Sequence, residues 1–283
     1  MDDGFDAPDG DIILRTQGPP VHDFRVHKLI LSLASPVFRD MFGVPQPKSY
    51  TSSIDIDVVD VTDPPRALAL VLKLIYPFPP PKVDDLDLLV QGLIIADKYN
   101  IEGVRVRLRE PLNKLMKEEP LRVYAIASRF GLEEEAEAAA SLTTSVYLPG
   151  LASSKLPNDL KHIPAPAYHK LIALHETHRH EIEDIINDVP FEPSCPACKV
   201  VKGLVEPWLR TKLVRIICRG ESITIAACAE EMTSDSCRES CMVKFVADVV
   251  AKLGRKNTVI HLGLGHPARR RVAHASRSRF VGL

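Results

Sequence analysis

Two pairs of cysteines near the end of the chain have a spacing that could hold a metal ion. Cys195 and Cys198 are two residues apart, and Cys237 and Cys241 lie three residues apart, on one face of a helical turn. Four thiolates are a common tetrahedral ligand set for a structural zinc ion. The gap of 38 residues between the pairs is longer than usual, so an intervening helix would have to bring them together.

We therefore predict a structural zinc site at these four cysteines. The alternative is that they are reduced, partly buried thiols that pack as small apolar side chains. A redox-active dithiol at Cys195 and Cys198 fits less well, because no strand–helix–strand pattern surrounds them.

Histidines are the other residue type whose positions suggest chemistry. The run from His175 to His180 lacks the His-Glu-x-x-His spacing, and an expected helix over 166–188 would place His175 and His178 on its apolar stripe. This pattern favours loose packing or a nearby surface groove over metal ligation. His27 is interpreted as structural, with its imidazole bonded to the backbone at a strand-to-helix corner. With no nucleophile elbow, phosphate loop or paired carboxylates in the sequence, we predict no catalytic residues.

Charge is distributed unevenly along the 283 residues. The chain has 36 Lys and Arg against 37 Asp and Glu, but the segment from Lys252 onward holds eight basic residues and no acidic ones. The first 251 residues therefore carry a net charge of −9. An acidic body with a basic tail is not typical of proteins that bind nucleic acid along one face, so we do not expect that activity.

The apolar content of 45% and charged content of 26% are typical of a globular chain. No apolar run approaches the roughly 18 residues of a membrane-spanning helix, and the acidic first residues do not resemble a signal peptide. We therefore expect a protein of the cytosol or nucleus that makes no membrane contact.

The first third of the chain combines short strands with helices. Alternating apolar residues predict strands over 11–16, 21–26 and 54–58. Two short helices are expected over 27–34 and 36–42, the second capped by Ser35, with Leu29, Leu33 and Val37 on their shared apolar face. Later helices are expected near 64–75, 84–95, 102–116, 119–130, 132–145, 166–188, 199–218, 222–231 and 237–252. The predicted fold class is α+β, with a small three-stranded sheet packed by helices and then an all-α extension.

The segment over 24–42 resembles the signature of the BTB/POZ domain. A His27-Lys28 pair begins one helix, and Ser35 and Phe38 head the next. Other landmarks follow the same order: Asp11–Leu14, Ile54–Val58, Leu72–Tyr76 and Ala96–Ile101. Leu121–Ala127 resembles the BACK-like helical extension that often follows this domain. The whole chain is similar to BTB proteins of mushroom-forming fungi, in which a C-x-x-C, a Trp (here Trp208) and a second Cys pair follow the helices.

The resemblance implies an organisation in five parts. A tail over 1–10 precedes a BTB/POZ-like domain over 11–117 and a BACK-like extension over 118–190. A cysteine-containing helical region over 191–253 and a basic, disordered tail over 254–283 complete the chain.

The resemblance also implies a protein–protein interaction adaptor with no enzymatic activity or small-molecule substrate. Such domains commonly pair with themselves, and some recruit cullin-type ubiquitin ligase scaffolds. The buried charge pair at the centre of the family's dimer maps onto Asp11 and Lys28, and the predicted interface adds His27, Phe38, Met41 and Phe42.

Two departures from the family pattern affect these expectations. Only ten residues precede the first strand, so an exchanged N-terminal helix is missing, and the loop over 43–48 lacks the apolar-x-Glu element associated with cullin binding. An alternative function is a zinc-stabilised nuclear regulator that uses the basic tail.

Overall fold

The computed structural model describes residues 4–6, 8–17, 21–44, 56–144, 157–194, 196–200, 202–218 and 236–255. These residues form two compact units, called unit 1 up to residue 174 and unit 2 from residue 175 onward. None of the described helices has the length and apolar content needed to cross a membrane.

Unit 1 begins with a three-stranded sheet, as expected. Strands β1 (Ile12–Thr16) and β2 (Asp23–Val26) form an antiparallel pair in which Ile12 lies opposite Val26. Strand β3 (Asp57–Val61) pairs with β1 in parallel, which gives the order β2-β1-β3. Alternate β1 side chains are buried against the helices, which is typical of a sheet with one face on the core.

The third strand begins later than the sequence predicts. It was expected over 54–58, whereas the structure has it from Asp57 to Val61, and residues 54 and 55 lie outside the described part of the chain. The run of alternating residues has the same period of two in either register. Pairing with β1, which sets Thr16 opposite Val61, decides the position.

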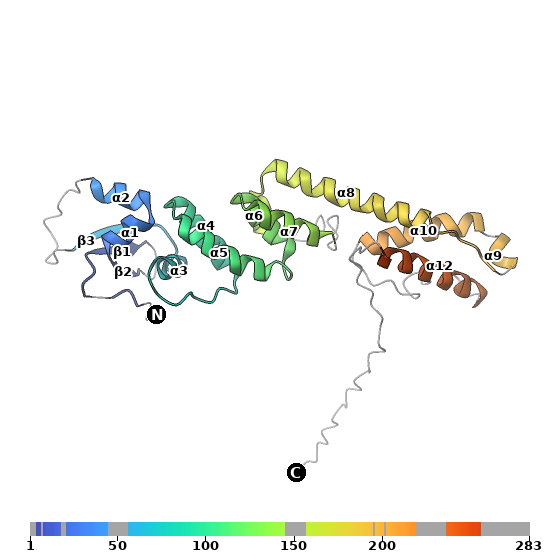
Figure 1. Cartoon of the computed structure of the whole chain (residues 1–283), viewed down its shortest axis with the longest axis horizontal. Coiled ribbons are helices and arrows are strands. Elements are labelled where there is room, and N and C mark those ends of the chain that lie inside the picture. Colours follow the sequence, from blue (N-terminus) through green and yellow to red (C-terminus); the bar gives the residue numbers. More distant parts are fainter. Residues whose placement is uncertain are drawn as a thin grey trace, which may run out of the picture. The chain divides into compact units, whose positions relative to one another are not determined.

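Two short helices connect β2 to β3 (Figure 1): α1 (Lys28–Ala34) and α2 (Pro36–Gly43). The predicted cap is confirmed, because the hydroxyl of Ser35 accepts a hydrogen bond from the backbone N–H of Phe38 at 3.1 Å. The same hydroxyl donates to the carbonyl of Tyr99 at 2.5 Å. Ser35 is completely buried, so it begins α2 and also attaches it to a later helix.

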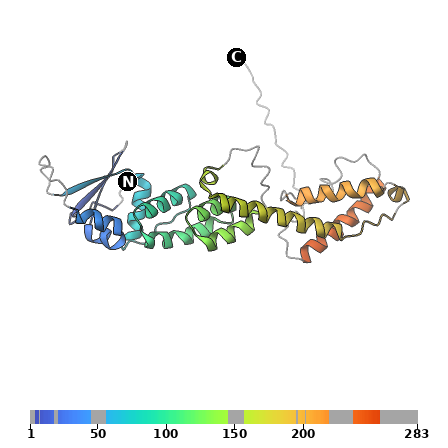
Figure 2. The same ribbon diagram turned by 90° about the horizontal axis from the view of Figure 1, so that it is seen from above.

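Three longer helices complete the N-terminal domain (Figure 2): α3 (Pro65–Ile75), α4 (Leu86–Lys98) and α5 (Glu102–Leu115). Helix α3 is buried along most of its length. A Cβ atom on Gly92 of α4 would lie only 3.2 Å from Leu108 and 3.3 Å from Leu70. The absence of a side chain at Gly92 therefore allows α4 to pack closely against both neighbours.

The same hydrophobic core continues into the helical extension. Helices α6 (Pro120–Arg129) and α7 (Glu133–Thr143) are followed by a short 3₁₀ helix, η2 (Asn158–His162), and by α8 (Ala165–Asn187). Gly131, at φ +68°, forms the turn that follows α6, which ends close to the predicted residue 130. One cluster of buried side chains runs from Phe5 in the first segment to Leu171 in α8.

Unit 2 has a separate core. It contains the second part of α8 together with α9 (Pro196–Val200), α10 (Lys202–Cys218) and α12 (Ser236–Arg255). Buried residues from three helices meet there, among them Ile182, Leu209 and Val249. The helix expected over 222–231 and the tail expected over 254–283 lie outside the described residues, apart from the end of α12. The α+β domain followed by helices is confirmed.

Candidate functional site

The corner between β2 and α1 is built around His27. Its backbone N–H donates to the Tyr76 hydroxyl at 2.8 Å, and its ring Nδ1 lies 3.1 Å from the same oxygen. Its Nε2 lies 3.4 Å from a carboxylate oxygen of Asp9. The imidazole of His27 therefore helps to hold this corner together, as predicted. Among the described residues its ring contacts the side chains of Tyr76 and Asp9, whereas the sequence predicted a hydrogen bond to the backbone.

Asp11 and Lys28 are close together, yet their charged groups do not pair. A carboxylate oxygen of Asp11 accepts a hydrogen bond from the backbone N–H of Lys28 at 2.7 Å, at the first turn of α1. The Lys28 ammonium instead reaches Asp57 of β3. Both Asp11 and Asp57 are exposed, so the expected buried charge pair is not formed within one chain.

One of the predicted interface residues, Phe38, belongs to the core, and two others pack beside it. Phe38 is only 2% exposed, and its ring stacks on Tyr99 with a centroid distance of 4.4 Å. Met41 and Phe42 are half-buried against the same cluster. Phe38 is buried because α2, capped by Ser35, turns this side chain toward Tyr99 at the end of α4.

The exposed apolar side chains of α1 and α2 are different ones. Leu29 is 69% exposed, Leu33 is 80% exposed and Val37 is 40% exposed, whereas Leu31 is fully buried. We call Leu29, Leu33 and Val37 the α1 face. The spacing predicts these three residues on one apolar face, and the structure leaves all three exposed. Because α1 is apolar on both sides, spacing alone could not tell which side meets the core.

Comparison with known proteins identifies the domain that carries this face. Residues 10–115 match the family model described as the BTB/POZ domain. Mouse TD and POZ domain-containing protein 5 is 32% identical over 91 residues, which is 32% of this chain and 26% of that protein. TD and POZ domain-containing protein 4 of mouse is 31% identical over 91 residues, covering 32% of this chain and 24% of its own length. Residues 10–115 form a BTB/POZ domain.

BTB/POZ domains are generally protein–protein interaction modules. The match covers about a quarter of the length of the two mouse proteins, so it bears on this domain and not on their other parts.

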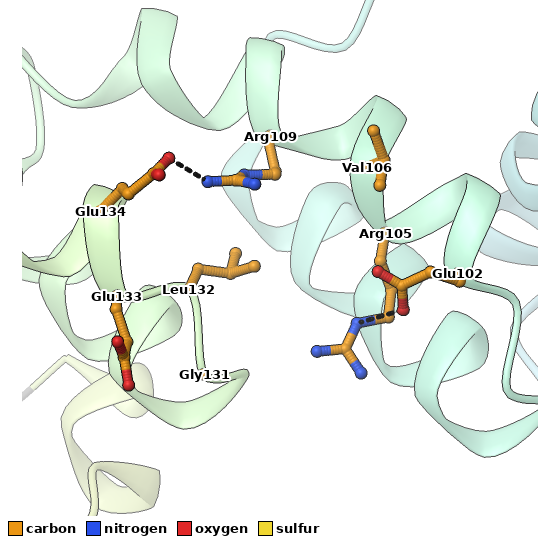
Figure 3. Close-up of a pocket in the computed structure, with 8 residues that line it drawn as sticks. All are labelled: Glu102, Arg105, Val106, Arg109, Gly131, Leu132, Glu133 and Glu134. Atoms are coloured by element: carbon orange, nitrogen blue, oxygen red, sulfur yellow. Dashed lines mark hydrogen bonds and ion pairs between the residues drawn. The ribbon is translucent and has the colours of Figure 1, made fainter.

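A pocket of about 300 Å³ lies where the BTB/POZ domain meets the extension, between α5 and the start of α7 (Figure 3). Arg109 bonds to Glu134 at 2.6 Å and to the buried Glu135 at 2.6 Å. Arg105 donates to the carbonyl of Phe130 at 2.9 Å. The guanidinium groups at this pocket are thus bound to the extension, so the pocket is a structural junction within unit 1.

A second junction centres on Arg122 of α6. Its guanidinium bonds to Asp159 at 2.6 Å, to Glu119 at 3.1 Å and to Asp87 of α4 at 2.5 Å. These hydrogen bonds raise the pKa of Arg122 despite its partial burial, so it stays charged at any ordinary pH. Arg122 therefore ties α6 to both the BTB/POZ domain and η2.

The predicted zinc ligands fall mostly outside the described residues. Cys195 and the side chains of Cys198 and Cys237 are not described, whereas Cys241 is buried in unit 2. Within the described part of the chain, no three His, Cys, Asp or Glu side chains gather as a metal-binding group.

Two of the histidines of α8, His175 and His178, are half-buried, whereas His169 and His180 are exposed. Burial lowers the pKa of His175 to about 4, with a smaller contribution from the neighbouring His178. Burial also lowers the pKa of His178. On the same helix Tyr168 and Ile172 are exposed, whereas Leu171 and Ile182 are buried.

Proposed function

We propose that this chain is a protein–protein interaction adaptor whose BTB/POZ domain pairs with a second copy through the α1 face. The observation that carries the proposal is the exposure of Leu29 and Leu33, one turn apart on a helix whose opposite side is buried. Burying one leucine side chain is worth about 1.5–3 kcal/mol. A second copy would supply the apolar surface that these side chains lack.

Polar groups next to the α1 face support pairing in a defined orientation. Asp11, Lys28 and Asp57 lie together at the first turn of α1. Charges at the edge of an apolar contact favour one register over others. The family resemblance adds weight, since BTB/POZ domains commonly self-associate through their helical face.

The test is a double substitution, Leu29→Glu with Leu33→Glu. We expect the unmodified chain to sediment as a dimer at micromolar concentration and the variant as a monomer. Two carboxylates in an apolar contact cost several kcal/mol, so the dissociation constant should rise at least about 100-fold.

The matched control is Val21→Glu, because Val21 is 59% exposed and lies before β2 and not on the α1 face. This substitution should leave the dimer intact. A strictly monomeric unmodified chain, or a dimer that survives the double substitution, would contradict self-pairing.

Finer roles stay predictions. One is the recruitment of a cullin-type ubiquitin ligase scaffold. The relationship to the BTB proteins of mushroom-forming fungi and the location in the cytosol or nucleus are also still predictions. Part of the 43–48 loop lies outside the described residues, so the departure noted there rests on sequence alone.

A zinc-stabilised regulator is the second candidate, and one contact favours it. The Ser194 hydroxyl oxygen lies 3.6 Å from the sulfur of Cys241. Because Ser194 directly precedes Cys195, this contact brings a member of the second cysteine pair next to the chain that leads into the first. That proximity is what a shared tetrahedral site requires.

We expect protein purified under reducing conditions to contain about one zinc ion per chain, as a structural site would hold. Chelation should lower the melting temperature of unit 2, because binding free energy at such a site is also folding free energy. Elemental analysis and thermal melts provide the measurements. The Cys241→Ser variant should lose the bound zinc. The control Cys218→Ser, at a cysteine outside both pairs, should retain it. Reduced protein that contains no zinc would rule the site out.

A further inference from the structure

A trough lies between α7 and the first part of α8 in unit 1, on a different surface from the α1 face. It encloses about 600 Å³. Its lining is mostly apolar and includes Leu132, which precedes α7, Ala136 and Ala140 of α7, and Ala167 and Leu171 of α8. The three alanines are only partly buried against the core, so a partner could still contact them.

The trough is elongated. Its lining at α7 runs from Leu132, just before the helix, to Ser141, and on α8 from Pro166 to Leu174, at helical intervals on both sides. At a rise of 1.5 Å per residue, these stretches are about 13 Å long. Small side chains along such a length allow the backbone of another helix to approach closely, and helices commonly dock into grooves of this kind.

The rim carries charges that define the partner further. Glu133 and Glu137 are exposed, lie one turn apart on α7, and form no ion pair with any described residue. Lys170 is the one basic residue among those lining the trough. A helix in the trough would therefore face two unneutralised carboxylates along its α7 side.

We propose that this trough binds an amphipathic helix of a partner protein, with apolar side chains directed inward and Lys or Arg residues beside Glu133 and Glu137. The inference does not depend on pairing through the α1 face. It gives unit 1 a second interaction surface, with a preference for basic amphipathic segments.

The probe is a labelled synthetic helix of about 14 residues, with leucines on one face and lysines on the flanks, long enough to cover the trough. A matched peptide carries glutamates in place of the lysines. Fluorescence anisotropy with the full chain should show saturable micromolar binding of the basic peptide, weakened by salt. The acidic peptide should bind at least about tenfold more weakly.

The variants assign the binding to the trough. Glu133→Lys with Glu137→Lys should reverse the preference between the two peptides, whereas Glu118→Lys, exposed and outside the trough, should leave it unchanged. The indole of Ala140→Trp should fill the trough and weaken the binding of both peptides. A thermal melt verifies that this variant is folded. The Leu29→Glu and Leu33→Glu variant should bind the basic peptide normally, which separates this test from that of self-pairing.

Three results would overturn the proposal. The first is an absence of saturable binding by the basic peptide. The second is equal binding by the unmodified chain and the Glu133→Lys and Glu137→Lys variant. The third is a change of sedimentation state in that variant, which would assign the trough to a second copy of this chain.

Discussion

Replacing Phe38 with alanine is expected to lower the free energy of unfolding of unit 1 by about 3–5 kcal/mol. The side chain is 2% exposed and its ring stacks between Tyr99 and Phe42, with centroid distances of 4.4 and 5.9 Å. Removing the ring would leave a cavity between α2 and the end of α4. Ser35, which bonds to the Tyr99 carbonyl, holds both sides of that cavity in place and limits its collapse.

Chemical denaturation followed by circular dichroism measures this loss. The control is Val44→Ala, at the end of α2, where the side chain is 60% exposed and the change should stay within about 0.5 kcal/mol. A Phe38→Ala protein with unchanged stability but impaired self-association would contradict the core position and restore the interface role that the sequence suggested.

The second large effect is expected for Arg109→Ala, which removes the pair between the BTB/POZ domain and α7. Glu135 is 4% exposed, and Arg109 approaches its two carboxylate oxygens at 2.6 and 3.0 Å. Without the guanidinium, a buried carboxylate loses its charged partner. Since Arg109 itself is about a third exposed, we expect the free energy of unfolding to fall at neutral pH, but by less than for the loss of a fully buried pair.

The pH dependence identifies the charge as the cause. Burial alone would raise the pKa of Glu135, but hydrogen bonds from Arg109 outweigh it and hold the pKa below the ordinary value of 4.5. A lowered folded-state pKa contributes stability above 4.5 that is lost as the pH falls through the lowered value. The difference between the unmodified chain and Arg109→Ala should therefore shrink in acid.

Denaturant unfolding at neutral pH and at several acidic values tests this expectation. Glu134→Ala provides the control, since that carboxylate bonds to the same arginine but is 86% exposed. Glu134→Ala should lower the free energy of unfolding by less than about 1 kcal/mol at any pH. A penalty for Arg109→Ala that stays constant from neutral to acid would mean that lost packing, and not the ion pair, is responsible.

Several local features followed from the residues alone. Ser35 predicted the start of α2, because capping depends on one or two residues. The ordered landmarks of the first third also led to the BTB/POZ resemblance, which the family match confirms.

The candidate site was harder to derive, because it depends on which side of a helix is covered. Helix α1 has leucines on both sides, so the sequence could not distinguish the buried Leu31 from the exposed Leu29 and Leu33. The trough was missed for a related reason: alanines on α7 and α8 carry no strong sequence pattern, and only the tertiary structure brings both sets to the lining of one trough.

The sequence by itself determined most of the described helices, the Ser35 cap and the kind of domain, since these depend on neighbouring residues and on a fixed order of motifs. Only the tertiary structure decided the register of β3, the partners of Lys28 and Arg109, and the exposed side of α1. Each of these depends on residues far apart in the chain. Whether a leucine lies in the core or on the surface is a property of what packs against it, and no short stretch of sequence contains that information.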